Sequence, residues 1–279
     1  MHVDPSNADA AKGWDGPTGD FWTENADMFE AGVARYLQPF LDTVAIEPRA
    51  HVLDVGCGAG QTTREAARLA TAGSATGVDL SARMLDLARR RAEQEGLSNV
   101  RFVQADAQVA DLGTDRYDRV ISRNGAMFFG DPVTAFANLA NAMKPDGRLA
   151  LLVWQPFPEN EWLGAFIGAV AAGRDLPPPP PDGPGPFSLG DPDRVRAVLT
   201  AAGFAEPHLA GLREPMYYGP DVATAERMVL GMVGGMLDDL DAAARASAEA
   251  ALRATLEEHL GSDGVTYGSA MWLVTAALR

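Results

Sequence analysis

The stretch from His51 to Gly60 constrains the fold of this chain more than any other segment. A short apolar run ends in Asp54, and three glycines then alternate with small residues: Gly56, Gly58 and Gly60. An apolar run of this length bounded by glycines is typical of a buried strand in a parallel sheet. Residues 61–69 have helical composition, so the stretch predicts a strand, a tight turn and a helix. Glycines at such a turn let a ligand approach the main chain, and the first amides of the helix face that ligand.

The spacing of these glycines narrows the kind of ligand. A dinucleotide fingerprint, Gly-x-Gly-x-x-Gly/Ala, needs a small last residue that packs the helix against the sheet. Counted from Gly56 that residue is Gln61, and counted from Gly58 it is Thr63. Neither fits, so the spacing argues against an NAD-dependent oxidoreductase. It still indicates a nucleotide-like ligand at the carboxyl end of the first strand.

Strands and helices are predicted to alternate after this turn. Further strands are expected at 75–80, 100–104, 117–122 and 149–154, and helices at 62–70, 82–95 and 135–143. Ser81 suits the N-cap of the second of these helices, and Gly96 suits its end. Residues 144–148 have the composition of a turn. This alternation implies right-handed crossovers and a parallel sheet.

Three acidic residues end three successive strands of this predicted sheet: Asp54, Asp79 and Asp106. The carboxyl ends of strands are where open α/β sheets bind ligands. A single acid there is explained by helix capping, but three in consecutive units, with glycines at the first, are not. They predict a shared binding edge.

The flanking regions are predicted from composition and periodicity. Residues 1–20, rich in Gly, Asp, Asn and Pro, are expected to begin as a loose tail, and residues 21–41 show a helical pattern. The run Pro177–Pro181 predicts a stiff extended connection. Other expected elements are a partly helical segment at 156–174, a helix at 192–202, a sixth strand at 204–212, two helices within 221–261 and a last strand at 265–278.

The composition narrows the class of protein further. Of 279 residues 47% are hydrophobic, which suffices for one sizeable core. The formal net charge of −15 would repel nucleic-acid phosphates, so no nucleic-acid partner is expected. Cys57 is the only cysteine, so no intramolecular disulfide forms. Because no apolar run approaches the ~20 residues of a membrane span and residues 1–20 lack a signal-peptide pattern, we expect a cytoplasmic protein with no membrane partner.

The sequence resembles the class I S-adenosylmethionine-dependent methyltransferases, in the bacterial branch that acts on small molecules. The resemblance is close over residues 52–154 and holds in outline beyond them. It rests on four motifs: Asp54-Val55-Gly56-Cys57-Gly58-Ala59-Gly60, Gly77-Val78-Asp79-Leu80-Ser81, Gln104-Ala105-Asp106-Ala107 and Met143-Lys144-Pro145-Asp146-Gly147. It implies an α/β, Rossmann-like sheet of seven strands, mainly parallel with an antiparallel last strand, with helices on both faces and a helical cap or lid.

The resemblance also implies a domain organisation. It comprises an N-terminal tail and helical lid (1–48), a cofactor-binding core (49–155), a lid or linker with the sixth strand (156–220), a helical insertion that caps the substrate (221–261) and the final strand (262–279). In this family the last two strands are usually joined directly. Because this chain has an insertion at 221–261 instead, the resemblance does not predict the substrate side of the site.

The implied cofactor is S-adenosylmethionine, with S-adenosylhomocysteine as product and no metal. The glycine turn would hold the methionine part, Asp79 would accept hydrogen bonds from both ribose hydroxyls, and Asp106 would bond the adenine amino group beside the Ala107 amide. Carboxylates suit a diol, and an acidic rim suits a sulfonium cation. The predicted cofactor-binding residues are Asp54, Gly56, Cys57, Gly58, Gly60, Asp79, Leu80, Met84, Asp106, Ala107, Arg123 and Asn124.

The acceptor side is less constrained. Candidate pocket residues are Trp22, Met127, Phe128, Met232 and Met236, and weak candidates for a general base are His208 and His259. Met228, Met232 and Met236 are spaced by four and would form one stripe on a helix. The simpler interpretation of this stripe is a contact with the core, and the alternative is the inner face of a lid. Four scattered histidines and one cysteine form no metal-ligand spacing.

The predicted function is therefore methyl transfer to a small molecule, such as a secondary metabolite, with O-, N- and C-methylation all open. The alternative is a non-catalytic cofactor-binding or regulatory protein of the same fold, or an enzyme that uses the cofactor otherwise. The intact glycine turn and the three acids favour the methyltransferase. The sequence leaves a monomer and a homodimer equally open.

Overall fold

A single twisted sheet organises the molecule in the computed structural model, which describes residues 1–176 and 183–279. The expected proline connection at Pro177–Pro181 lies outside the described residues. The strand order is β3-β2-β1-β4-β5-β8-β6. The strands are β1 (His51–Val55), β2 (Ser74–Asp79), β3 (Val100–Gln104), β4 (Tyr117–Arg123), β5 (Met143–Trp154), β6 (His208–Gly219), β7 (Leu260–Gly261) and β8 (Gly264–Ala277).

The pairing confirms a mainly parallel sheet with an antiparallel last strand. Strands β1 to β5 pair in parallel, whereas β8 is antiparallel to both neighbours, β5 and β6. The two-residue β7 pairs with the start of β8 and lies off the main strand order. The order reverses between β1 and β4, which places a crevice at the carboxyl ends of those two strands.

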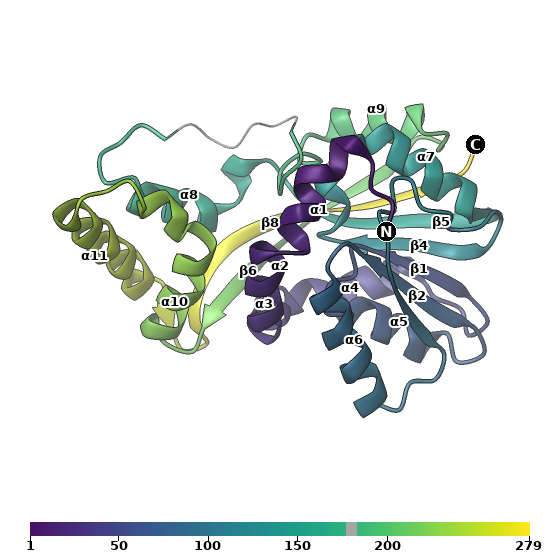
Figure 1. Ribbon diagram of the computed structural model, residues 1–279, viewed down its shortest axis with the longest axis horizontal. Coiled ribbons are helices and arrows are strands. Elements are labelled where there is room, and N and C mark those ends of the chain that lie inside the picture. Colours follow the sequence, from purple (N-terminus) through teal and green to yellow (C-terminus); the bar gives the residue numbers. More distant parts are fainter. Residues whose placement is uncertain (177–182) are drawn as a thin grey trace.

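Helices cover both faces of the sheet, as predicted (Figure 1). Helices α4 (Ala34–Val44), α5 (Gln61–Leu69) and α6 (Ala82–Gln94) lie on one face, and α7 (Pro132–Ala142) and α9 (Pro192–Ala201) lie on the other. The predicted N-cap of α6 is confirmed, because the Ser81 hydroxyl accepts a hydrogen bond from the Met84 amide. Asp131 and Asp191 cap α7 and α9 in the same way, and each is followed by a proline at the first helical position.

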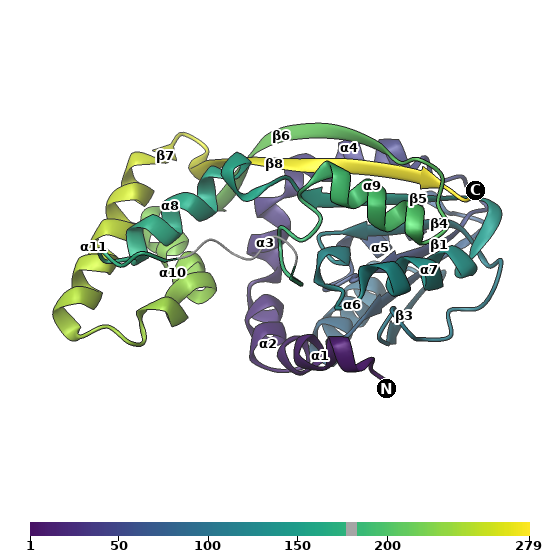
Figure 2. The same cartoon turned by 90° about the horizontal axis from the view of Figure 1, so that it is seen from above.

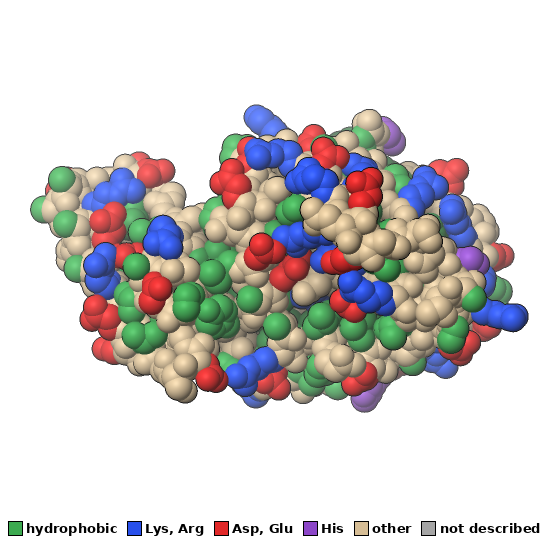
Figure 3. Space-filling model, turned by 90° about the horizontal axis from the view of Figure 1, so that it is seen from below, with side chains coloured by type: hydrophobic (Ala, Val, Ile, Leu, Met, Phe, Trp, Pro, Cys, Tyr) green, Lys and Arg blue, Asp and Glu red, His purple; other side chains and the backbone are tan. Residues whose placement is uncertain are grey.

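Strands β6 and β8 extend beyond the rest of the sheet and carry a separate helical lobe (Figure 2). The lobe consists of α8 (Glu161–Val170), α10 (Val222–Val233), the short 3₁₀ turn η4 (Gly234–Leu237) and α11 (Ala242–Glu258). The two helices expected within 221–261 are therefore present. Figure 3 shows hydrophobic side chains gathered where this lobe meets the body, with acidic and basic side chains interspersed elsewhere on that face.

The N-terminal residues differ from the loose tail that their composition predicts. They form η1 (Pro5–Asn7), α1 (Ala8–Trp14) and α2 (Pro17–Glu24), and Asn7 is buried. The single helix expected at 21–41 is instead three: the end of α2, α3 (Ala26–Gly32) and α4. The prediction from composition was wrong because tertiary contacts order the N-terminal segment. The main ones are its hydrogen bonds to Asp106.

Two other segments differ from the predictions. The turn expected at 144–148 lies within β5, where the register against β4 shifts between Tyr117 and Arg119. The sixth strand begins at His208 and continues to Gly219, beyond the expected 204–212. Phe204 forms only an isolated bridge to Leu278, because the long antiparallel partner β8 determines the extent of β6.

Gly130→Ala should displace the N-terminal segment. A Cβ atom at Gly130 would lie 2.2 Å from the Ser6 carbonyl oxygen, and the Gly130 amide donates to Asn7 Oδ1 at 2.6 Å. Such overpacking typically costs about 1–3 kcal/mol, so we expect a lower Tm and faster proteolysis before residue 15. Gly168→Ala is the matched control, because nothing lies within 4 Å of its added Cβ and alanine is the better helix former. Equal Tm values and equal proteolysis rates in the two variants would contradict the close packing of Gly130 against Ser6.

Candidate active site

A cavity of about 360 Å³ lies at the carboxyl ends of β1 and β4, where the strand order reverses. The N-terminal helices α1 to α3 form one wall, the sheet forms the floor, and the helical lobe closes one end. We call residues 1–32, which include α1 to α3, the N-terminal lid. The cavity therefore collects side chains from segments far apart in the sequence, in agreement with the edge that the three acids predict.

The glycine turn passes so close to the loop after β4 that side chains would not fit between them. Gly56, Gly58 and Gly60 all have positive φ values, 66°, 53° and 79°. A Cβ atom at Gly56 would lie 2.7 Å from the Cα atom of Gly125. Glycine is therefore required for both the backbone conformation and the close approach. The turn exposes its main chain to the cavity, as expected.

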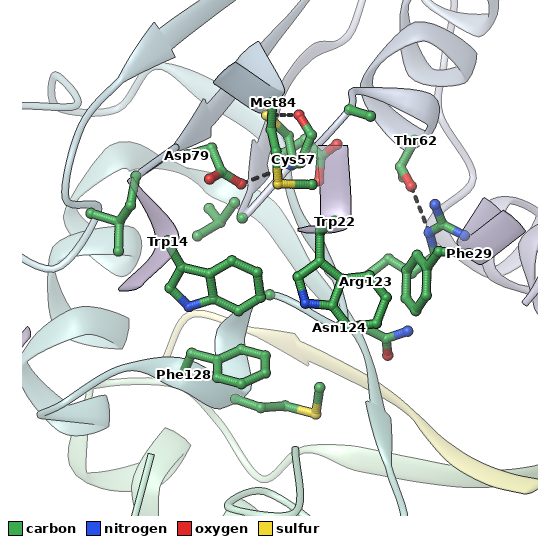
Figure 4. Close-up of a pocket in the computed structure, with 18 of the residues that line it drawn as sticks. Trp14, Trp22, Phe29, Cys57, Thr62, Asp79, Met84, Arg123, Asn124 and Phe128 are labelled. Atoms are coloured by element: carbon green, nitrogen blue, oxygen red, sulfur yellow. Dashed lines mark hydrogen bonds between the residues drawn. The ribbon is translucent and has the colours of Figure 1, made fainter. Parts of the chain in front are cut away.

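Asp79 fastens the glycine turn to the end of β2. Its Oδ2 atom accepts a hydrogen bond from the Gly58 amide at 2.8 Å, and its Oδ1 atom accepts from the Ser81 amide at 2.9 Å. Burial raises the pKa of Asp79, and these amides oppose that shift. Leu80 and Met84 line the cavity beside it. The Asp79 carboxylate therefore holds the glycine turn in place and also lines the cavity (Figure 4).

Asp54 is almost completely buried at the end of β1. The Thr63 hydroxyl donates to its Oδ2 atom at 2.6 Å. Burial raises the pKa of Asp54 to about 7, while the Thr63 hydrogen bond and the charge of Arg123 act in the opposite direction. Cys57 also lines the cavity, and burial raises the pKa of its thiol well above the ordinary value. The thiol is therefore protonated at neutral pH.

Asp106 is held by the N-terminal lid, which the sequence did not indicate. Its Oδ2 atom accepts from the Asp4 amide at 3.0 Å, and its Oδ1 atom accepts from the Asn7 side chain at 2.9 Å and the Gln108 amide at 3.0 Å. Asp106 and Ala107 still line the cavity. The carboxylate of Asp106 therefore already anchors the lid. To bind the adenine amino group as predicted, it would have to make that contact in addition.

Arg123 and Asn124, at the end of β4, present polar atoms without partners. Arg123 donates from Nε to Thr62 Oγ1 at 2.9 Å and from Nη2 to Gln61 Oε1 at 2.8 Å. Its Nη1 atom and both side-chain amide atoms of Asn124 are buried and have no hydrogen-bond partner among the residues that the structure describes. Figure 4 shows both side chains at the cavity. Unsatisfied buried polar atoms are costly, so they indicate a place where a ligand completes the hydrogen bonding.

The other end of the cavity is apolar and aromatic. Its lining includes Trp14, Trp22, Phe29, Met127, Phe128, Trp154, Trp162, Met216 and Met232. Trp14 meets Phe128 edge-on with ring centroids 5.1 Å apart, and Trp22 meets Phe29 in the same way at 5.0 Å. The lid supplies Trp14 of the first pair and both rings of the second, so its packing against the core completes this apolar wall.

The structure separates the predicted acceptor residues. Trp22, Met127, Phe128 and Met232 line the cavity, but Met236 does not. The stripe breaks because α10 ends at Val233, so Met236 lies in η4, where its carbonyl accepts from Arg174 at 2.7 Å. Trp14, Trp162, Met216 and Glu30 also line the cavity, and no local pattern in the sequence marks them.

Neither histidine candidate lies at the cavity. His208 is exposed at the start of β6. The His259 ring stacks on Tyr267 at 3.8 Å, and its Nε2 atom lies 3.2 Å from Glu161 Oε1. The structure therefore does not support a role for either as a general base.

Within residues 1–176 and 183–279, no group of three His, Cys, Asp or Glu side chains is arranged to hold a metal ion. No helix in the same ranges combines the length and apolar character of a membrane span.

Comparisons with known proteins agree on one family. Residues 52–147 match the family model described as a methyltransferase domain. The chain is 29% identical to nocamycin O-methyltransferase of Saccharothrix syringae, over 65% of this chain and 70% of that protein. It is 31% identical to demethylmenaquinone methyltransferase of Thermus thermophilus, over 55% and 74% respectively. The crystal structure of the YcgJ protein of Bacillus subtilis superimposes with a TM-score of 0.60, 22% identity and coverage of 88% of this chain and 99% of that one.

Asp54→Asn should change the pH dependence of stability. Because folding raises the pKa of Asp54 from its ordinary value to about 7, the stability it contributes is lost as the pH rises toward 7. Thr63, Arg123 and Asp79 face this carboxyl, and asparagine keeps an acceptor for the Thr63 hydroxyl. We therefore expect the difference in Tm, variant minus wild type, to be more positive at pH 8 than at pH 5. Asp86→Asn, an exposed acid on α6, is the control, and an equal difference at both pH values would contradict the burial of Asp54.

Proposed function

The chain belongs to the class I S-adenosylmethionine-dependent methyltransferases, and we propose that it methylates a small, largely apolar acceptor at the cavity described above. One observation carries the proposal: the cavity has a polar end, built from the glycine turn and the acid-ended strands, and an apolar aromatic end. A nucleoside with a charged amino-acid tail suits the first end. A planar or aliphatic acceptor suits the second.

The polar end fits S-adenosylmethionine in its chemistry. Asp79 would accept hydrogen bonds from the ribose hydroxyls, and Asp106 with Ala107 would border the adenine. The unpartnered atoms of Arg123 and Asn124 match the charged methionine end. When bound, the cofactor supplies a methyl group already activated by its sulfonium, so the protein contributes chiefly positioning and exclusion of water.

Exclusion of water would come from the lid. Trp14 and Trp22 approach the cavity from α1 and α2, and the lid is attached to the core through Asp106. A closed apolar wall strengthens the attraction between the acidic rim and the sulfonium, because little water screens it. The aromatic rings would also orient the acceptor toward the methyl group.

The described residues on the apolar side of the cavity include Met127, Trp154, Trp162, Met216 and Met232, none of which is titratable, and this bears on the acceptor. The acids that line the cavity are Asp54, Asp79, Asp106 and, on α3, Glu30. We propose an acceptor whose own nucleophile ionises near neutral pH, such as an acidic phenol or enol. Two relatives, nocamycin O-methyltransferase and demethylmenaquinone methyltransferase, are likewise named for small-molecule acceptors.

Calorimetry tests the cofactor assignment. We expect S-adenosylhomocysteine to bind and NAD to give no heat. Asp79→Ala should weaken binding of S-adenosylhomocysteine by ~1–3 kcal/mol, the range for hydrogen bonds to a charged acceptor. Asp86→Ala, outside the cavity, should bind as the wild type does. Tight NAD binding with no response to S-adenosylhomocysteine would end the proposal.

Met232→Ala and Met236→Ala test the acceptor end. Only Met232 lines the cavity, although both methionines are partly buried against the core. The acceptor is first found by following S-adenosylhomocysteine release with a panel of phenols, naphthols and quinols. For an acceptor that turns over, we expect Met232→Ala to raise KM about tenfold, as the loss of some 1–2 kcal/mol of apolar contact predicts. Met236→Ala should leave KM unchanged, and equal KM values in both variants would show that Met232 is only a packing residue.

A further inference from the structure

The lid is attached to the core by polar contacts and to the lobe by an apolar one. Toward the core, four acids of the lid form hydrogen bonds or ion pairs with α6. These are Asp15 with the Ala82 amide at 2.9 Å, Asp20 with Arg83 at 2.6 Å, and Asp27 and Glu30 with Arg91. Among residues 1–176 and 183–279, no hydrogen bond or ion pair joins the lid to the lobe. The two attachments therefore differ in kind and can open separately.

The lid meets the lobe at a glycine. A Cβ atom at Gly231 of α10 would lie 2.0 Å from the Phe21 ring of α2, so the ring lies directly against the backbone of α10. Gly231 is exposed, and glycine is a poor helix former there. Its presence at this point is explained by the room that it leaves for the ring. We call the contact between Phe21 and Gly231 the lid–lobe contact.

The sequence neighbours of the lid–lobe contact line the cavity at its apolar end. Trp22, next to Phe21, lines the cavity from the lid, and Met232, next to Gly231, lines it from the lobe. Phe21 is partly buried and meets Trp22 edge-on, with ring centroids 5.2 Å apart. The outer surface where the lobe meets the body is rich in hydrophobic side chains (Figure 3). Displacement of the Phe21 ring would therefore connect that surface with the apolar end of the cavity.

We propose that the methyl acceptor enters and leaves the cavity at the lid–lobe contact, past the Phe21 ring, while the polar contacts of the lid with α6 and Asp106 keep the cofactor enclosed. The inference rests on the proposed function, because it assumes that an apolar acceptor and S-adenosylmethionine share the cavity. An apolar path admits such an acceptor and disfavours the charged cofactor, since burying an unpaired charge is costly. Phe21 and Gly231 thus control access of the acceptor and take no part in the reaction.

Stopped-flow fluorescence tests the route, with 2-naphthol as the probe and the protein saturated with S-adenosylhomocysteine. Phe21 is not among the described residues that line the cavity, so its loss should change how fast the probe passes and not how tightly it is held. Phe21→Ala should raise the association and dissociation rate constants of 2-naphthol together, each about tenfold, and leave its Kd within about twofold. A residue that only supports the fold, or that contacts the bound probe, would change the Kd.

Gly231→Ala tests the same contact from the lobe. The added methyl group prevents the Phe21 ring from lying against α10, so both rate constants should rise as in Phe21→Ala. In the Phe21→Ala background, Gly231→Ala should have no further effect. Gly235→Ala is the matched control, because nothing lies within 4 Å of its added Cβ, and it should leave both rate constants unchanged. Where Phe21→Ala does not fold, Phe21→Leu replaces it.

Arg91→Gln tests the attachment of the lid to the core. It removes the partner of Asp27 and Glu30, so we expect radiolabelled S-adenosylhomocysteine to dissociate faster in a chase experiment, with the rate constants of 2-naphthol unchanged. Arg90→Gln, an exposed arginine of the same helix, is the control and should release S-adenosylhomocysteine as the wild type does.

The outcomes separate this inference from the proposed function. If Phe21→Ala and Gly231→Ala leave the rate constants of 2-naphthol unchanged, or speed S-adenosylhomocysteine release equally, the separate route is wrong. If the wild type binds S-adenosylhomocysteine but no 2-naphthol, the proposed apolar acceptor and this inference are both wrong. A wild-type protein that binds neither would overturn the proposed function as a whole.

Discussion

The close approach of two main-chain segments is the constraint on which the site depends. The glycine turn after β1 and the loop after β4 touch through Gly56 and Gly125, with no side chain between them. This contact lets the two strands end side by side at the point where the sheet order reverses. The amides of the turn are bonded within the protein, those of Gly56 and Cys57 to the Val78 carbonyl and that of Gly58 to Asp79, so the turn is held firmly beside the cavity. A methyl group at either glycine would separate the segments and close the space that the cofactor is expected to fill.

The second element of the site is a lid attached at both ends. Its N-terminal residues donate two hydrogen bonds to Asp106, from the Asp4 amide and the Asn7 side chain, and Asn7 Oδ1 accepts a third from the Gly130 amide. At the lobe, Gly231 of α10 leaves room for the Phe21 ring of α2, since a Cβ atom there would lie 2.0 Å from that ring. The glycines of α10 therefore do more than weaken a helix. One of them allows the lid and the lobe to pack together over the cavity.

The cavity divides its charges from its apolar surface. Among the described lining residues, Asp54, Asp79 and Arg123 lie at the ends of β1, β2 and β4, and several of the rings and thioethers come from the lobe and the strands that carry it. Burying ionisable groups is expensive unless each has a partner. Asp54 accepts a hydrogen bond from the Thr63 hydroxyl, and its raised pKa favours the uncharged form. Asp79 accepts hydrogen bonds from two backbone amides. Arg123 and Asn124 retain unpartnered atoms, which is why they are the most informative residues of the site.

Local patterns in the sequence were sufficient for the core. The βα alternation, the glycine spacing and the acids at 54, 79 and 106 depend on neighbours within one strand, turn or helix, and the parallel sheet follows from them. The antiparallel last strand was implied by the family resemblance. The ordered N-terminus, the attachment of Asn7 to Asp106, the place of Glu30 and the separation of Met232 from Met236 were decided only by the tertiary structure. These features arise where segments tens to hundreds of residues apart meet, and a contact of that kind leaves no periodicity in either segment. The aromatic end of the cavity is the clearest case, because its rings come from the lid, the sheet and the lobe and become one surface only when those parts pack together.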